Sequence, residues 1–162
     1  MRNILLPIAG AACLWSGIAA ADHFVGACEC GKADPQHFLP AGDRADHTLG
    51  VEALKCAWSK PLDINGDKAK ESVATEIIEI SGKRFHGNGV HEIAFQSGDK
   101  VALPYHGVGI ARNDQEASNK GSFTFAEGTG KLKGIKGTGT FSCKSIGDST
   151  NCAVEGDYQL PR

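Results

Sequence analysis

Sustained helical periodicity, blocks of like charge and long apolar runs are all scarce in this 162-residue sequence. Without helical periodicity, a helical bundle is excluded as the fold of the main domain. The net charge is −2 and no basic cluster is present, so neither nucleic acid nor an anionic membrane is favoured as a partner. The longest apolar run, from Ile4 to Ile18, is too short to favour a transmembrane helix.

Motifs of several enzyme classes are also missing. No Gly-x-Ser-x-Gly motif is present, which excludes the nucleophile turn of the α/β-hydrolases. The glycines near Gly128 lack the Gly-Lys-Ser/Thr ending of a phosphate-binding loop. Cys28 and Cys30 are separated by one residue rather than two, so the spacing typical of thiol oxidoreductases is absent.

The first residues are typical of a cleaved secretory signal. Arg2 precedes the apolar run, and three alanines at 19–21 supply the small residues that signal peptidase requires. We therefore predict a signal peptide over residues 1–21 and a secreted or periplasmic protein. A lipoprotein signal is the alternative, because Cys13 and Cys28 each follow small and apolar residues.

The remaining sequence is predicted to be all-β, since short alternating segments are separated by glycine, asparagine, aspartate, serine or proline. Evenly spaced short strands favour a sandwich or a closed barrel, and closure removes exposed edges. Residues 22–47 are polar and contain Pro35 and Pro40, so we predict an irregular cysteine-containing arm before a barrel domain over residues 48–162. The candidate strands are Leu49–Trp58, Val73–Ile80, Gly89–Gln96, Lys100–Ile110, Gly121–Phe125, Lys131–Gly134, Gly137–Cys143 and Cys152–Leu160.

Five cysteines follow the predicted signal, and an odd number leaves at least one thiol without a partner in the chain. If Cys143 pairs with Cys152 across two strands, Phe141 lies opposite Val154 and both apolar faces coincide. We therefore predict a Cys143–Cys152 disulfide. Cys56 is predicted to bond with either Cys28 or Cys30.

The run EGTGKLKGIKGTGTF, from Glu127 to Phe141, resembles a glycine-spaced segment of proteins with the allene oxide cyclase and dirigent type of barrel, including small secreted bacterial proteins. Gly156 to Pro161 resembles the closing strand of that bacterial group, and Gly98 to Val101 resembles its central hairpin. The resemblance covers about Leu49 to Pro161. It implies an eight-stranded antiparallel closed barrel of the calycin-like kind, with a central cavity that can hold an apolar small molecule. Family members include cyclases that isomerise a fatty-acid epoxide and dirigent proteins that orient radicals.

A hairpin centred on Gly98 and Asp99 supplies one group of candidate site residues. A loop of two or four residues at this position places His91 opposite His106, with Glu92 and Tyr105 on the other face. The paired imidazoles could bind a ligand, bind a metal or share a proton. We predict that they contribute to ligand binding together with a set of aromatic side chains, namely Phe95, Tyr105, Phe123 and Phe125.

Soft metal ligands gather near the predicted mature N-terminus. His23, Cys28, Cys30, His37 and His47 offer sulfur and nitrogen ligands for copper or zinc. In an oxidising compartment these cysteines more often form disulfides. We therefore predict no cofactor and keep copper or zinc as the alternative.

The sequence favours a non-enzymatic barrel that binds a small apolar ligand or a partner surface through interior aromatics such as Phe141 and Tyr158. The same aromatics would equally well fill a closed core. One alternative is an isomerase or cyclase that uses the barrel cavity, and the other is a periplasmic copper or zinc protein. The partners predicted are thus a small apolar ligand, with no nucleic acid and no membrane span.

Overall fold

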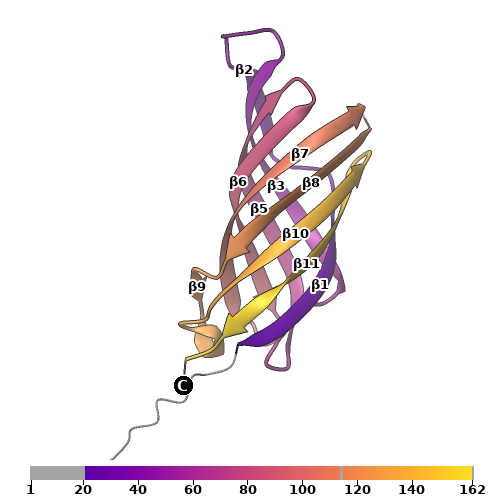
Figure 1. Ribbon diagram of the computed structural model, residues 1–162. Helices are drawn as coiled ribbons and strands as arrows, with labels where there is room; N and C mark the ends of the chain where they lie inside the picture. Colours follow the sequence, from indigo (N-terminus) through magenta and orange to yellow (C-terminus); the bar gives the residue numbers. More distant parts are fainter. Residues whose placement is uncertain (1–20, 114, 162) are drawn as a thin grey trace, which may run out of the picture.

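The strands alternate inward and outward side chains as the sequence predicts, but most of them are longer than the predicted segments. The computed structural model describes residues 21–113 and 115–161, so all but the last residue of the predicted 1–21 signal lies outside the described residues. Eight antiparallel strands form a closed barrel (Figure 1). They are β1 (Asp22–Cys30), β3 (His47–Lys60), β5 (Asp67–Ser81), β6 (Arg84–Phe95), β7 (Lys100–Asn113), β8 (Glu116–Thr124), β10 (Lys136–Ile146) and β11 (Ser149–Gln159).

The barrel closes because β3 pairs with a different strand on each side. Along one edge it pairs with β5 from His47 to Ala57, and along the other it pairs with β1, with Cys30 opposite Cys56. The strand order is then β3, β1, β11, β10, β8, β7, β6, β5 and back to β3. The predicted all-β, eight-stranded antiparallel barrel is confirmed.

The N-terminal arm is the main correction to the predicted architecture. Residues 22–30 are not irregular but form β1, a full barrel strand between β3 and β11. Phe24, Cys28 and Cys30 alternate with exposed residues and are buried, so this segment has the period of a strand. The prolines and most of the polar residues lie in the part that follows. There the short strand β2 (Gln36–Pro40) pairs with residues 48–52 of β3.

Lys131–Gly134 was predicted to be a strand but is not one. Because β1 is an additional strand, the barrel still has eight. A short 3-10 helix, η1 (Gly130–Leu132), lies at the end of the barrel near the chain's C-terminus (Figure 1). Two short strands lie at its margins, β4 (Asp63–Ile64) on β5 and β9 (Glu127–Gly128) on β7. In the described part of the chain, no helix has the length and hydropathy needed to cross a membrane.

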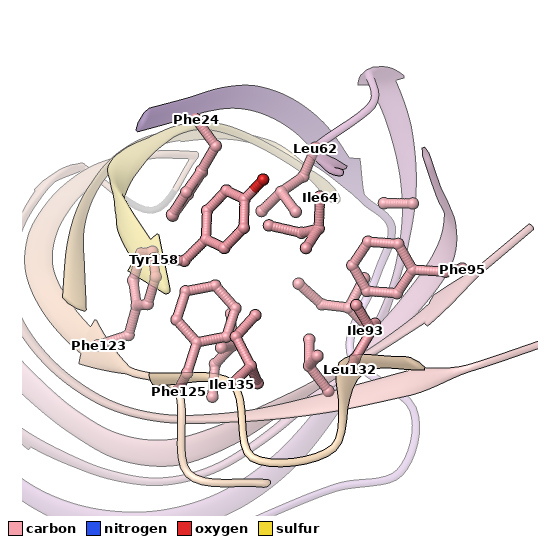
Figure 2. Packing of buried hydrophobic residues seen from close by; sticks show 13 residues of the cluster. Phe24, Leu62, Ile64, Ile93, Phe95, Phe123, Phe125, Leu132, Ile135 and Tyr158 are labelled. Atoms are coloured by element: carbon pink, nitrogen blue, oxygen red, sulfur yellow. The ribbon is translucent and has the colours of Figure 1, made fainter. Parts of the chain in front are cut away.

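The end of the barrel near η1 is filled by apolar side chains, and we call it the packed end. Figure 2 shows its side chains pointing toward one another inside the ring of strands. Leu62, Ile64 and Ile93 are almost fully excluded from solvent. The cluster consists of Phe24, Leu62, Ile64, Ala69, Ile93, Phe95, Val101, Leu103, Phe123, Phe125, Leu132, Ile135 and Tyr158.

Glycines facing the interior make room for large rings. A Cβ on Gly121 would lie 2.5 Å from the Phe141 ring, and one on Gly139 would lie 2.3 Å from the Phe123 ring. Any larger residue at these positions would displace an aromatic side chain. The glycine-spaced segment from Gly121 to Cys143 therefore reflects ring packing as well as turns.

Candidate functional site

Above the packed end the barrel contains a cavity of about 100 Å³ that is partly open to solvent. Its floor is shared with the packed end through Leu62, Ile93, Leu103 and Phe123. We call this part of the barrel the cavity end; its lining residue Leu54 follows the segment of β3 that pairs with β2. The other lining residues are Cys28, Cys30, Leu54, Trp58, Ala74, Glu76, His91, Tyr105, Asn119, Phe141, Cys143, Thr150, Cys152 and Val154.

A carboxyl group and a phenol form the polar centre of this cavity. Glu76 on β5 accepts a hydrogen bond from the Tyr105 hydroxyl on β7, with 3.1 Å between Oε2 and Oη. Burial raises the pKa of Glu76 to about 7, with further contributions from a hydrogen bond and charge repulsion with Glu52. Glu76 therefore carries a proton for part of the time near neutrality and can donate it to a bound molecule. Burial, followed by the charge of Glu76, also raises the pKa of Tyr105, so its hydroxyl stays protonated.

Two glycines of β6 make this arrangement possible. A Cβ on Gly87 would lie 2.5 Å from Glu76 Oε2, and a Cβ on Gly89 would lie 2.8 Å from both the Glu76 Cβ and the Tyr105 ring. The absence of side chains on β6 thus leaves the space that Glu76 and Tyr105 occupy.

Three polar atoms on the cavity wall are buried and have no hydrogen-bond partner among the described residues: His91 Nε2, Trp58 Nε1 and Asn119 Oδ1. The His91 and Trp58 rings stack with centroids 6.3 Å apart and planes inclined by 12°. Burial lowers the pKa of His91 to about 4, so its imidazole is neutral at pH 7. Unpartnered buried polar atoms cost free energy, so a molecule that supplied partners would gain from binding here.

Cysteines of three adjacent strands, β1, β11 and β10, line the other side of the cavity end. Cys143 pairs in register with Cys152, and Cys152 pairs with Cys28. The predicted Cys143–Cys152 disulfide is present, and Cys56 bonds with Cys30 rather than Cys28. Cys28 is the free thiol of the described chain, and burial raises its pKa to about 11. At neutral pH it is a thiol rather than a nucleophilic thiolate.

The predicted pairing of His91 with His106 is wrong. His91 lies opposite Leu103, and His106 lies opposite Asn88. The turn between β6 and β7 has three residues, since Phe95 N–H donates to Asp99 C=O and Gly98 adopts a positive φ of 92°. Changing the loop from an even to an odd number of residues shifts the pairing by one residue. Each side chain of β7 then points to the opposite face of the sheet from the one predicted. His91 and Tyr105 therefore face the cavity, whereas His106 is exposed and lies 3.3 Å from Ser122 Oγ.

The predicted aromatic site residues divide between the two ends of the barrel. Tyr105 and Phe123 line the cavity. Phe95 and Phe125 belong to the packed end and do not line it. Phe141, predicted as an interior aromatic, lines the cavity and meets Tyr105 edge to face, with centroids 5.8 Å apart.

The predicted N-terminal metal ligands do not form one cluster. His23 lies 3.0 Å from Asp157, and His37 is exposed on β2. His47 lies between two carboxylates, Asp43 and Glu79. Among the described residues, the sulfur atoms of Cys28, Cys30 and Cys56 are within 4.8 Å of one another, but the Cys30–Cys56 disulfide leaves only Cys28 as a thiol. The cysteines therefore do not offer the soft ligand set on which the copper or zinc alternative depended.

The sequence analysis did not single out Glu76, Trp58 or Asn119, and it considered Cys28 only as a metal ligand or a disulfide partner. A usable signal exists for Glu76, because inward positions of β5 continue in steps of two through Ala74, Glu76 and Ile78. A carboxylate in the inward phase of a strand is unusual and indicates a polar site inside a barrel.

Comparison with known proteins supports the fold. The sequence matches no family model and no curated protein. Among solved structures it is similar to a pterocarpan synthase dirigent protein, at 12% identity and a TM-score of 0.50. The match covers 95% of this chain and 98% of the other. At this identity the similarity establishes a dirigent-like barrel fold and no more.

Proposed function

We propose that this chain is a non-enzymatic binding protein that holds one compact, mainly apolar molecule with a single polar group in the cavity end. The observation that carries the proposal is the set of buried, unpartnered polar atoms on the wall of an otherwise apolar cavity. His91 Nε2, Trp58 Nε1 and Asn119 Oδ1 would gain partners from a ligand hydroxyl or amide.

The size of the cavity limits the ligand. A volume of about 100 Å³ is below the 300 to 1,000 Å³ usual for drug-sized ligands. It is close to the roughly 150 Å³ of an engineered protein cavity that binds benzene. The aromatic side chains of Trp58, Tyr105 and Phe141 form a wall suited to a flat ring. A substituted single ring with one hydroxyl group therefore fits both the volume and the polar atoms.

Two further observations support the proposal. The similar solved structure is named a dirigent protein and a pterocarpan synthase, which is consistent with a barrel of this kind acting on small molecules. The two disulfides are of the kind that persists in oxidising compartments, which supports the proposal that the protein is secreted or periplasmic.

Tryptophan fluorescence provides the test. The sequence contains two tryptophans, and Trp15 lies in the predicted signal peptide, so Trp58 on the cavity wall is the single reporter once that segment is removed. Titration with p-cresol should change its emission in a saturable way, and toluene, which lacks the hydroxyl, should bind more weakly. No saturable change with any single-ring phenol would contradict the proposal.

A matched pair of variants locates the binding. Ala74 lines the cavity, whereas Ala57 is exposed on the outer face of β3. Ala74→Leu should fill the cavity and abolish the response to p-cresol, and Ala57→Leu should leave it unchanged. Equal binding by both variants would place the ligand outside the barrel.

Glu76 favours a second candidate function, an isomerase that uses the cavity. Its carboxyl is partly protonated near pH 7 and lines the cavity beside the Tyr105 hydroxyl, so it could protonate a strained oxygen. The cavity is too small for a long-chain epoxide but admits a single-ring one such as styrene oxide. Conversion of styrene oxide to its aldehyde isomer, lost in Glu76→Gln, would support this function, and absence of any conversion would exclude it for this substrate class.

A further inference from the structure

A connected group of histidine and carboxylate side chains lies on the outer surface of the barrel, away from the cavity. His47 begins β3, Glu79 lies near the end of β5 and His86 lies near the start of β6. All three side chains face outward, and Glu79 is directly opposite His86 in the sheet. The loop before β3 adds Asp43, whose carboxylate contacts the His47 ring.

The contacts hold one carboxylate between two imidazoles. His47 Nε2 is 2.8 Å from Glu79 Oε1, and His86 Nε2 is 3.2 Å from Glu79 Oε2. On the far side of the ring, His47 Nδ1 is 2.5 Å from Asp43 Oδ1. Asp43 therefore accepts a hydrogen bond from His47 Nδ1–H, and this contact directs Nε2 at Glu79. Metal-bound histidines commonly donate their second ring N–H to a carboxylate in the same way.

We propose that His47, Glu79 and His86 form a binding site for a divalent cation of the zinc type. Two imidazole nitrogens and one carboxylate are the protein ligands of many open zinc sites, in which water occupies a remaining position. The cation would replace the hydrogen bonds that now join each imidazole to Glu79. Asp43 would keep its bond to His47 Nδ1 and act as a positioning residue.

The surroundings favour a cation at this point. Arg44 lies in the same loop as Asp43, and its guanidinium is directed to Asp43 at 2.8 Å and Asp46 at 3.6 Å. A third contact joins it to Ser81 Oγ at 2.7 Å. Glu79, in contrast, contacts the imidazoles of His47 and His86.

The site is rigid on one side and adjustable on the other. The His47 side chain is 13% exposed and held at both ring nitrogens, whereas the His86 side chain is 51% exposed. The two Nε2 atoms now face different oxygens of Glu79, so His86 must turn toward His47 to share an ion. A half-exposed side chain at the start of a strand can make this movement without disturbing the barrel.

Isothermal titration of the full, non-reduced chain with zinc chloride tests the proposal. We expect one zinc ion per chain with micromolar affinity. His47→Ala, His86→Ala and Glu79→Gln should each abolish measurable binding, and Asp43→Asn should weaken it by about 10-fold to 100-fold. Far-UV circular dichroism should show that each variant keeps its fold.

Two control variants separate this site from the others. His23→Ala removes a second exposed histidine that also contacts a carboxylate, Asp157, and should leave zinc binding unchanged. Cys28→Ser should likewise have no effect. Absence of binding, binding that survives the His47→Ala/His86→Ala double variant, or binding lost only in Cys28→Ser would each overturn the proposal.

Discussion

The packed end and the cavity end are built from the same strands, and they differ in what those strands present to the interior. Along β6 the inward residues change from Phe95 and Ile93 to His91, and then to Gly89 and Gly87. The inward residues of β7 change in the same direction, from Val101 and Leu103 to Tyr105, Gly107 and Gly109. Apolar side chains at the packed end thus give way to polar rings and then to glycines, and the Phe85 and Phe141 rings lie over the glycines of β7.

This comparison shows how a small barrel can combine a core with a site. An eight-stranded barrel has an interior that its own side chains can fill, so a cavity requires positions where they do not. Glycines at one end of β6 provide that space, and Glu76 and Tyr105 occupy part of it. The packed end supplies the hydrophobic stabilisation that permits polar groups to be buried at the cavity end.

The largest expected difference between the ends is in core truncation. Phe95 is 2% exposed at the packed end, so Phe95→Ala should lower the free energy of unfolding by about 3–5 kcal/mol. Phe141 lies on the half-buried cavity wall, where solvent can enter the space left by its ring. Phe141→Ala should therefore lower the free energy of unfolding by about 2 kcal/mol less than Phe95→Ala does. Urea unfolding of both variants measures the difference. Equal losses would mean that the two ends are packed alike.

The two disulfides give the next largest effect. Cys30 and Cys56 are 26 residues apart, and Cys143 and Cys152 are 9 apart. Replacing Cys30 and Cys56 by alanine should cost about 2–4 kcal/mol of unfolding free energy. Loop entropy predicts that losing the Cys143–Cys152 bond costs about 1 kcal/mol less. If the shorter loop proves the more important one, local strain or packing at the cavity end outweighs chain entropy.

Glu76 should make the cavity end sensitive to pH. Its pKa is raised from 4.5 to about 7, so between these values the folded chain holds a proton that the unfolded chain releases. The free energy of unfolding therefore falls as pH rises through this window. Glu76→Gln should remove this fall and stabilise the protein by about 2 kcal/mol at pH 8, with little effect at pH 4.

Glu92 provides the control for that measurement, because it is exposed on the outer face and pairs with Lys100. Glu92→Gln should change stability little at pH 8. A Glu76→Gln variant that is less stable than the parent at pH 8 would show that the carboxylate is favourably solvated and that the cavity end is wetter than we infer.

The smallest expected effect concerns the free thiol. In a Cys13→Ser background, Cys28 should react with a thiol reagent much more slowly in the folded than in the unfolded chain, because it is 2% exposed and its pKa is about 11. Cys28→Ser should change the unfolding free energy by about 1 kcal/mol. Rapid labelling at pH 7 would indicate an accessible thiolate and would reopen covalent chemistry in the cavity.

Strand period and turn residues were sufficient to predict an all-β domain, and the resemblance to the dirigent type of barrel pointed to eight strands. Each of the eight barrel strands except β1 was anticipated over at least part of its length. β1 was missed because prolines at 35 and 40 made the whole N-terminal segment look irregular, although Phe24, Cys28 and Cys30 alternate like a strand. Cys143–Cys152 was predictable because a short hairpin fixes its own register.

The site was harder to predict than the fold because it depends on which face of each strand points inward. A three-residue turn after Phe95, instead of two or four, put Tyr105 inside and His106 outside. Glu76, Trp58 and Asn119 come together from β5, β3 and β8, and no local pattern connects residues so far apart in the sequence. Long-range register is therefore the information that the sequence alone did not supply.

A crystal structure of the protein grown with p-cresol tests the central claim, that the cavity end is a binding chamber and the packed end is a core. We predict one p-cresol molecule among Trp58, Tyr105 and Phe141, with its hydroxyl hydrogen-bonded to a wall group such as Asn119 or Glu76, and an unchanged packed end. A cavity closed by its own side chains, with p-cresol absent or bound only to the outer surface, would contradict the claim.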